Sequence, residues 1–356
     1  MKKRTALAVL TMAATLVMTA CGNSNSGTTT AAAKETTNET ATQAAGNSGD
    51  YPKAGTVGTF YIGGSVGAGG DLNMRTLIRY LEPKMGITLV PQNVTGSRTI
   101  YNAVKNMLKE PADGYTFAYL LYPHCVTEQY NPDTKESAYT FDDYYTLCNL
   151  VTDSAVIAVR ADDERFKDVN DLSGLVDYLK NTGDHLLISS CSIAGDDDIT
   201  DHKIMLKIPE IADQLTIING ESVSDGITSL LGGTLDIFTG NVGDVGTLLE
   251  DGEIKVLCVF AEERSKFLPD VPTAKECGYD IISSTSRGVV VNKDIAPENL
   301  EKIQSYIEAV VEDPEFLKDM ETQGFEVDYK KPEDYKAWLQ SEYDVFGEIA
   351  EEYGWQ

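Results

Sequence analysis

The sequence predicts an α/β protein, because short apolar runs alternate with amphipathic helical runs along most of its 356 residues. The alternation begins at residues 56–62 and restarts near residue 155, which indicates two lobes. Five of the six loops that follow the best strand candidates contain glycine, and all six contain Ser, Thr, Asn or Tyr. About 300 residues follow the N-terminal region, enough for two separate cores. We therefore expect two parallel α/β lobes with polar loops between them.

The pattern assigns each element in turn. In the first part we expect a strand at 56–62, a helix at 72–85 ended by Gly86, a strand at 87–92, a helix at 99–108 and a strand at 116–121. The second part predicts strands at 155–159, 186–189, 215–218, 235–238 and 254–260, and helices at 171–181, 224–231 and 242–250. The last part predicts a strand at 288–291 and helices at 297–312, 314–323 and 332–353, each beginning with a proline.

The N-terminus predicts export. Three basic residues precede an apolar stretch that is shorter than the roughly 20 residues of a membrane span, which is typical of a signal peptide. Residues 16–21 resemble a bacterial lipobox, so we expect residues 1–20 to be removed and Cys21 to be lipidated. An ordinary secretory signal that happens to contain a cysteine is the alternative. Residues 21–50 lack aromatic side chains and are expected to form a flexible tether between the membrane and the folded body.

Charge and cysteine content exclude several classes of function. Without the signal, the chain has 26 Lys and Arg against 56 Asp and Glu, a net charge of −30, which disfavours nucleic acid as a partner. After Cys21 five cysteines remain, without C-x-x-C spacing. This pattern argues against zinc and redox sites and favours buried thiols, although one or two disulfides are possible. We expect no cofactor, no metal and no nucleic acid.

Residues 63–71, Gly-Gly-Ser-Val-Gly-Ala-Gly-Gly-Asp, allow two interpretations. A strand, a glycine loop and a helix start direct several N–H groups at one point, where the helix dipole favours an anion. The first five letters also match G-x-S-x-G, the turn that carries a hydrolase nucleophile at Ser65. The glycines after Ser65 disfavour an immediate helix, and His124, His185 and His202 have no distinctive setting. We therefore expect a binding protein rather than an enzyme. The loop also lacks the G-x-G-x-x-G of dinucleotide sites.

Several motifs then resemble one family. Residues 67–75 match G-x-G-x-D-x-x-x-R, the first signature of the tripartite tricarboxylate transporter receptors, also called the Bug family of extracytoplasmic solute-binding proteins. The similarity continues, in family order, through Asn-Val-Thr-Gly-Ser at 93–97, Asp-Gly-Tyr-Thr at 113–116, Leu-Leu-Gly-Gly-Thr-Leu-Asp at 230–236, Glu-Arg-Ser at 263–265 and Leu-Pro-Asp-Val-Pro-Thr at 268–273.

The resemblance implies a two-lobed, periplasmic-binding-protein-like fold of type II, with lobe 1 at 51–154 plus 262–356 and lobe 2 at 155–261. It also implies a small carboxylate ligand, such as a di- or tricarboxylate, that is held in the cleft and delivered to membrane permease subunits. The ligand-binding residues that it implies in lobe 1 are Gly64, Ser65, Ala68, Gly69, Asp71, Thr95, Gly96 and Ser97. Those in lobe 2 are Ser190, Ser192, Gly195, Asp196, Gly220, Asn241 and Asp244.

The acidic run that follows Gly195 differs from a plain anion site. Asp196, Asp197 and Asp198 could cap and begin a helix at 199–206, where acidic groups are favourable. They could instead pair with a positive group on the ligand, such as the amine of an amino acid or another zwitterion. A metal held by Asp198 and His202 is the third interpretation.

The remaining candidates have structural or indirect roles. Arg75 and Arg98 could contact an anion, but structural ion pairs are the better interpretation. Asp71 is expected to cap its helix and to hold N–H groups of the glycine loop, while Tyr122 is placed to pack on a ligand. Transport is the expected function, and a sensor that presents its liganded form to a membrane kinase is the alternative.

Overall fold

A six-strand path forms the first sheet of the computed structural model, which describes residues 51–220 and 222–355. The strands follow the order β10 (Val327–Lys330), β4 (Tyr144–Arg160), β9 (Ser284–Asn292), β3 (Thr116–Tyr122), β1 (Val57–Gly63) and β2 (Thr88–Val94). All described residues fall within one compact unit. The predicted signal, Cys21 and the tether at 21–50 lie outside them.

The predicted parallel sheet is wrong for about half of this path. Strands β1, β2 and β3 pair in parallel, but β9 runs antiparallel to both β3 and β4. The reason is connectivity, because a parallel strand requires a crossover and β9 instead enters from the irregular stretch 260–283. The start of β9 therefore lies beside the carboxyl end of β3, with Ser286 opposite Tyr122.

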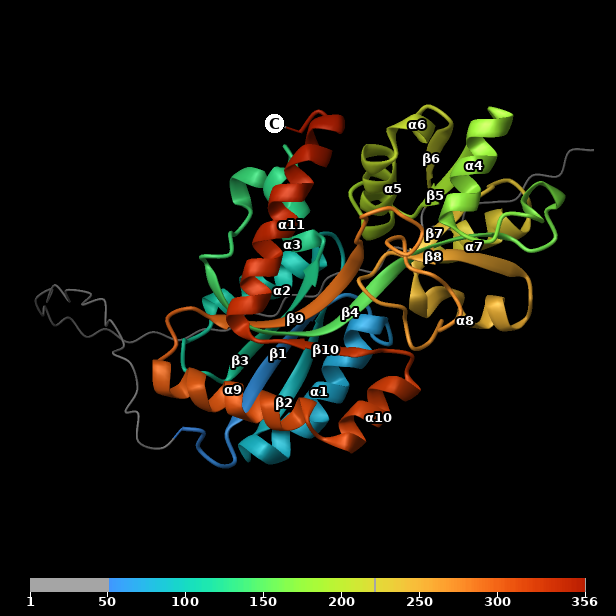
Figure 1. Cartoon of the computed structure of the whole chain (residues 1–356). Helices are drawn as coiled ribbons and strands as arrows, with labels where there is room; N and C mark the ends of the chain where they lie inside the picture. The colour runs from blue at the N-terminus through green and yellow to red at the C-terminus, as the bar shows by residue number, and fades with distance from the viewer. Residues whose placement is uncertain (1–50, 221, 356) are drawn as a thin grey trace, which may run out of the picture. The chain divides into compact units, whose positions relative to one another are not determined.

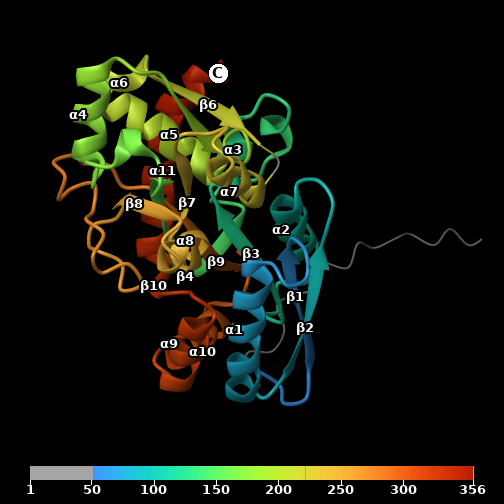
Figure 2. The ribbon, with the colours of Figure 1, turned by 90° about the vertical axis from the view of Figure 1, so that its right-hand side faces the viewer.

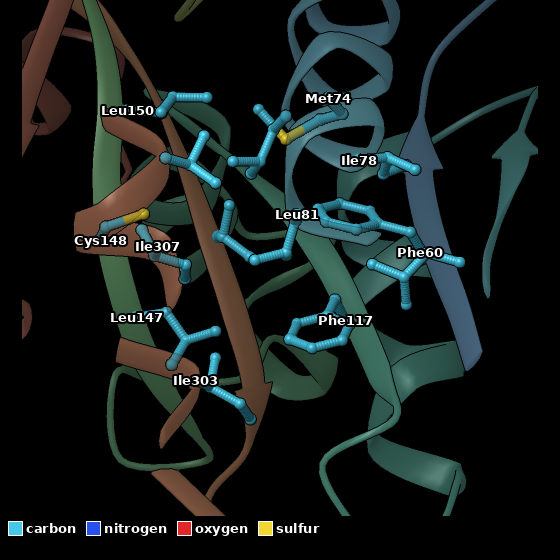
Figure 3. Packing of buried hydrophobic residues seen from close by; sticks show 14 of the residues in the cluster. Phe60, Met74, Ile78, Leu81, Phe117, Leu147, Cys148, Leu150, Ile303 and Ile307 are labelled. Carbon is cyan, nitrogen blue, oxygen red and sulfur yellow. The ribbon is translucent and has the colours of Figure 1, made fainter. Parts of the chain in front are cut away.

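Helices cover both faces of the first sheet. One face carries α1 (Gly69–Met85), α9 (Pro297–Val311) and α10 (Pro314–Thr322); the other carries α2 (Thr99–Lys109), α3 (His124–Tyr130) and α11 (Pro332–Glu352). Alternate residues of β3 serve the two faces, since Phe117 packs toward α1 and Ala118 packs toward α11. In α1 the stripe Met74, Leu77, Ile78, Leu81 and Met85 has helical spacing and is buried against Phe60 and Phe117 (Figure 3).

The second sheet continues from the same long strand. Residues 144–154 of β4 pair with β9, whereas residues 155–160 pair with β7 (Phe238–Asn241) and β8 (Ile254–Val259). Strands β5 (Leu186–Ser190) and β6 (Leu215–Asn219) pair in parallel and are joined to this sheet by a bridge between Ile188 and Ile237. Its helices are α4 (Leu172–Thr182), α5 (Asp196–Lys207), α6 (Pro209–Ala212), α7 (Val223–Leu231) and α8 (Val242–Glu250). Figures 1 and 2 show β4 running from one sheet to the other.

Three predicted strands differ clearly from the structure, and one of them is β9, which begins at Ser284 rather than at residue 288. The prediction placed β4 at 155–159 and missed its first part, where polar residues interrupt the apolar pattern. One of these is Asn149, which is fully buried and donates from Nδ2 to Asp328 O at 2.8 Å and to Thr152 Oγ1 at 2.9 Å. Strand β7 begins at Phe238 rather than at residue 235, because the chain before it is held by other bonds. Asp236, for example, accepts a hydrogen bond from Leu187 N–H at 2.8 Å.

The two sheets have separate hydrophobic cores. The first sheet is filled by two clusters, and the second sheet has two clusters of its own, around α4 and around α8. One cluster of the first sheet also includes Ala194 and Ile199 from the start of α5. The exact lobe boundaries at 154/155 and 261/262 stay a prediction. Within the described residues, no helix is both long and apolar enough to cross a membrane.

Candidate solute-binding site

The glycine loop after β1 is shaped by Asp71. Gly64 and Gly67 have φ angles of +121° and +85°, a backbone region that favours glycine. Asp71 is buried and accepts from Gly67 N–H at 2.8 Å, from Arg75 Nε at 2.8 Å and from Asn93 Nδ2 at 2.9 Å. Burial alone would raise the pKa of Asp71, but these hydrogen bonds lower it below its usual value. Asp71 therefore acts as a brace for the loop.

The start of α1 differs from the prediction. The helix begins at Gly69 and its N-cap is Ala68, so Asp71 lies inside the first turn and is not the N-cap. Glycine is a poor helix former, but tertiary packing decides here. A Cβ on Gly70 would lie 2.7 Å from Tyr119 Cε1, so only glycine lets the helix lie this close to β3.

A cavity of about 250 Å³ lies between the start of α1 and the second sheet. This volume is slightly below the roughly 300–1,000 Å³ of common ligand pockets, so it suits a small metabolite. Its lining from the first sheet and α1 is Gly69, Gly70, Tyr119, Leu121, Thr285 and Arg287. Its lining from the other side is Cys191, Asp196, Asp197, Val223, Gly240, Asn241 and Asp244.

Arg287 is the cation of this cavity and was missed from the sequence. Its side chain is 12% exposed, lies over the Phe325 ring at 4.7 Å and donates from Nη1 to Asn73 Oδ1 at 3.3 Å. Its Nη2 lies 3.6 Å from Asp153 Oδ2. The predicted site residues follow parallel strands, whereas Arg287 belongs to antiparallel β9, whose beginning reaches the same edge of the sheet. Basic residues just before predicted strands were the signal that could have found it.

Burial changes the acid–base behaviour near Arg287. Desolvation, with smaller contributions from nearby Asp244 and Asp196, raises the pKa of Asp153 to about 6 despite the opposing effect of Arg287. The pKa of Tyr119 is raised to about 12, mainly by burial. Tyr119 therefore stays a neutral hydroxyl group at physiological pH.

The opposite wall is acidic. Asp196, Asp197 and Asp198 form the first turn of α5, as the helix-start interpretation expected. The helix begins at Asp196 rather than at residue 199, and its N-cap is Gly195, so none of the three aspartates caps it. Asp197 accepts from the N–H groups of Cys191 and Asp198, and Asp198 accepts from Ala194 N–H and the Tyr353 hydroxyl. Asp196 lines the cavity and accepts from Asn241 Nδ2 at 2.7 Å. Burial, followed by the charge of Asp196, raises the pKa of Asp197 to about 6.

Asn241 and Asp244 complete this wall at the start of α8. Asn241 N–H donates to Asp244 Oδ2 at 2.8 Å, as in a capping box. The Asn241 side chain faces Asp244 N–H in return, yet its buried Oδ1 accepts no hydrogen bond of normal geometry. Burial is the main cause that raises the pKa of Asp244.

The structure therefore gathers only part of the predicted site. Gly69, Asp196, Asn241 and Asp244 line the cavity, together with Arg287 and the other residues that the sequence did not indicate. Several predicted residues are exposed outside its lining, namely Ser65, Ala68, Thr95, Gly96, Ser97, Ser192 and Gly220. Three others also lie outside the lining, with Gly64 half-buried and Ser190 and Gly195 buried.

Tyr122 is not placed on the ligand side. It is 1% exposed and donates to Glu342 Oε2 of α11 at 2.5 Å, so its ring belongs to the core. The structural ion pairs expected for the two arginines are confirmed, since Arg75 pairs with Asp71 at 2.8 Å and Arg98 pairs with Glu128.

The hydrolase and metal interpretations receive no support. Ser65 lies exposed in a turn, and α1 begins four residues later rather than directly after it. His202 contacts Glu352 at 2.6 Å, while Asp198 is turned to Ala194 and Tyr353. Across residues 51–220 and 222–355, no group of three His, Cys, Asp or Glu side chains is arranged to hold a metal ion. The five cysteines of these ranges are unpaired.

The last two family motifs, at 263–265 and 268–273, have a structural role. Arg264 donates from Nε to Glu276 at 2.8 Å and from Nη1 to Pro269 O at 3.1 Å, and Glu276 accepts from Thr273 N–H at 2.8 Å. These bonds fold the connection between β8 and β9. A larger cavity of about 530 Å³ borders this connection, and Asp153 lines it. We favour the smaller cavity as the site, because Arg287, the glycine loop and α5 meet there.

Solved structures share this fold. A TctC solute-binding protein from Polaromonas superposes with a TM-score of 0.73 at 20% identity, covering 85% of this chain and 99% of that chain. The Rhodopseudomonas palustris protein Rpa4515 with adipate gives 0.67 at 18% identity, covering 85% and 98%. MatC from Rhodopseudomonas palustris with bound malate gives 0.63 at 16% identity, covering 84% and 100%. At these identities the likeness establishes an α/β, periplasmic-binding-protein-like fold.

Family membership follows from the sequence over most of its length. The model of the tripartite tricarboxylate transporter family receptor, TctC, matches residues 74–355. This family consists of solute-binding receptors of the extracytoplasmic space rather than enzymes. The chain therefore belongs to the TctC family of tripartite tricarboxylate transporter receptors.

Proposed function

We propose that this chain is a lipid-anchored receptor that captures a small organic carboxylate in the cavity between its two sheets and delivers it to the membrane subunits of a tripartite transporter. The observation that carries the proposal is the Arg287 guanidinium, which is largely buried at the cavity beside Gly69 and the N-terminus of α1. Guanidinium and helix N–H groups are the donors that bind carboxylates well. Two structural relatives, described as bound to malate and with adipate, support this ligand class.

Delivery requires a change that the permease can recognise. In the proposal, lobe 1 (51–154 plus 262–356) and lobe 2 (155–261) close on the ligand by bending where β4 and the chain before β9 pass between them. Hinges of this kind are a few residues at element ends. Ser154 and Ser284 face each other in the last pair of the β4–β9 ladder, and the chain on either side of them is the candidate hinge.

The proposed anchor is Cys21, which lies outside the described residues. If it is lipidated, the whole protein fractionates with membranes, and mass spectrometry of its N-terminal peptide finds a diacylglyceryl cysteine. Cys21→Ser should then release the protein into the soluble fraction while leaving ligand binding unchanged. A wild-type protein found only in the soluble fraction would remove the anchor from the proposal.

The ligand class is tested by thermal unfolding of the purified protein with malate, adipate, succinate and citrate. A ligand at 100 times its Kd should stabilise the folded state by about 2.7 kcal/mol. Arg287→Gln should weaken binding roughly 30-fold, whereas Arg79→Gln, a change in an exposed arginine of α1, should not affect it. The proposal fails if no organic acid shifts the unfolding temperature, whether or not it carries an amine, or if Arg287→Gln binds as well as the parent.

A further inference from the structure

The charges of the cavity are unequally divided between its two walls. Arg287 is the cationic residue of the lining, and it lies on the side of α1 and the first sheet. Asp196, Asp197 and Asp244 all lie on the opposite side, at the starts of α5 and α8. A ligand that reaches across the cavity therefore meets a positive group at one end and carboxylates at the other.

The partners of Arg287 leave room for a carboxylate. A guanidinium has five N–H donors. The contacts of Arg287 with Asn73 Oδ1 and Asp153 Oδ2 are long, at 3.3 Å and 3.6 Å, compared with a normal charged hydrogen bond of about 2.8 Å. Arg287 also lies beside the Tyr119 hydroxyl, which is neutral. A ligand carboxylate could thus form the close, bidentate contact that no carboxylate of the protein supplies.

The acidic wall has no cation of its own. Within the described chain, none of Asp196, Asp197 and Asp244 lies within ion-pair distance of a Lys, Arg or His side chain. Each of the three carboxylates accepts a hydrogen bond from an N–H group instead. For Asp196 the donor is Asn241 Nδ2, at 2.7 Å. Burial raises the pKa values of Asp197 and Asp244, and the charge of Arg287 only partly opposes this effect at Asp244.

A second observation on the same wall also points to a donor on the ligand. Asn241 lines the cavity, and its buried Oδ1 faces the N–H of Asp244 but accepts no hydrogen bond of normal geometry. A buried acceptor without a donor is unfavourable, because it has lost its hydrogen bond to water. The same side chain donates from Nδ2 to Asp196, so the unpaired oxygen and the Asp196 carboxylate are adjacent.

We propose that the solute is a zwitterion, a small carboxylic acid that also carries an ammonium group, with its carboxylate toward Arg287 and its ammonium toward Asp196 and Asn241. An ammonium group offers three donors and one positive charge, which match an unpaired acceptor and an uncompensated carboxylate. The inference rests on the proposed function, because it names the class of carboxylate that the same site takes. A plain dicarboxylate would place its second negative charge against the acidic wall.

The test compares probes that differ by one amine. Isothermal titration of the purified protein near neutral pH uses succinate with L-aspartate, glutarate with L-glutamate, and propionate with L-alanine. We expect the amine-bearing member of at least one pair to bind roughly 30-fold more tightly than its partner, the ratio typical of a buried charge pair. If acids without an amine bind and every amine-bearing partner binds no better, the inference is wrong and the proposed function stands. If no probe of either kind binds, the proposed function fails and the inference falls with it.

A variant then assigns the preference to the acidic wall. Asp196→Asn keeps the shape of the side chain and removes its charge, so the amine-bearing probe should lose most of its advantage while its amine-free partner binds as well or better. Asp177→Asn, an exposed change on α4, is the matched control and should leave both affinities unchanged. An unchanged preference in a folded Asp196→Asn protein would contradict the proposed orientation. The probe comparison in the parent protein stands even if this variant unfolds.

Discussion

Helices α1 and α5 begin in the same way, yet they treat the acidic residues of their first turns differently. Each helix follows a strand and a glycine-containing loop, and each has aspartate in its first turn. In α1 the buried Asp71 has a cation, Arg75, at 2.8 Å. In α5 the aspartates 196–198 are bonded to N–H and hydroxyl groups and have no cation within ion-pair distance in the described chain.

This difference separates two uses of one local motif. A carboxylate that is paired inside its own loop fixes the loop and adds no net charge to the cavity. Carboxylates that are held by neutral donors keep their charge available to a ligand or accept a proton instead, which is why the pKa of Asp197 is raised to about 6 while that of Asp71 is lowered. In the proposed site, Asp196 and Asp197 are therefore the residues of α5 that would affect ligand choice, whereas Asp71 fixes the shape of the glycine loop.

The largest expected effect comes from Asp71→Asn. The variant removes the carboxylate from Arg75, which keeps only its bond to Asn93, and weakens the brace on Gly67. The free energy of unfolding should therefore fall by about 3 kcal/mol near neutral pH. Because the pKa of Asp71 is lowered in the folded state, its stabilising contribution exists above the usual pKa of aspartate and is lost as the pH falls. Urea unfolding over a pH series measures both effects. A loss of equal size at low pH would show that the charge of Asp71 is not the cause.

The next largest difference is expected between alanine substitutions of two glycines, Gly70 at the start of α1 and Gly195 before α5. A Cβ on Gly70 would lie 2.7–2.9 Å from three atoms of the Tyr119 ring, which is buried and cannot move away, so Gly70→Ala should cost about 2 kcal/mol. A Cβ on Gly195 would first meet Ser192 Oγ at 2.5 Å, and the exposed serine can rotate. Gly195→Ala should cost about 1 kcal/mol or less. Thermal unfolding of both variants tests the order, and a reversed order would contradict this account of the packing.

The sequence predicted the helices and strands of this fold better than the direction in which the strands pair. The stripe from Met74 to Met85 predicted α1 almost completely, because helical periodicity is a local property. The direction of β9 could not be predicted in this way, since it depends on the route of the chain through residues 260–283. The site followed the same division. Asp196, Asn241 and Asp244 follow predicted strands in the sequence and were expected, whereas Arg287 reaches the cavity only because β9 is antiparallel.

The smallest effect, with the opposite sign, is expected from Asp201→Asn in α5. Asp201 is fully buried, accepts from Thr239 Oγ1 at 2.6 Å through one oxygen, and has no partner for the other. Burial raises its pKa well above the usual value, the Thr239 hydrogen bond opposes this, and Asp197 and Asp198 add to it. Folding therefore retains a proton that the unfolded chain releases, so the contribution of this group to stability is full at low pH and declines as the pH rises.

Asparagine cannot titrate, and the Asp201→Asn variant should be more stable than the parent near pH 8 by up to about 1 kcal/mol, with no gain near pH 4. Urea unfolding of both proteins over this pH range, with Asp177→Asn as the exposed control, measures the difference. Parallel pH profiles for parent and variant would mean that Asp201 is ionised in the folded protein, and the contrast between α1 and α5 would then lose its electrostatic basis.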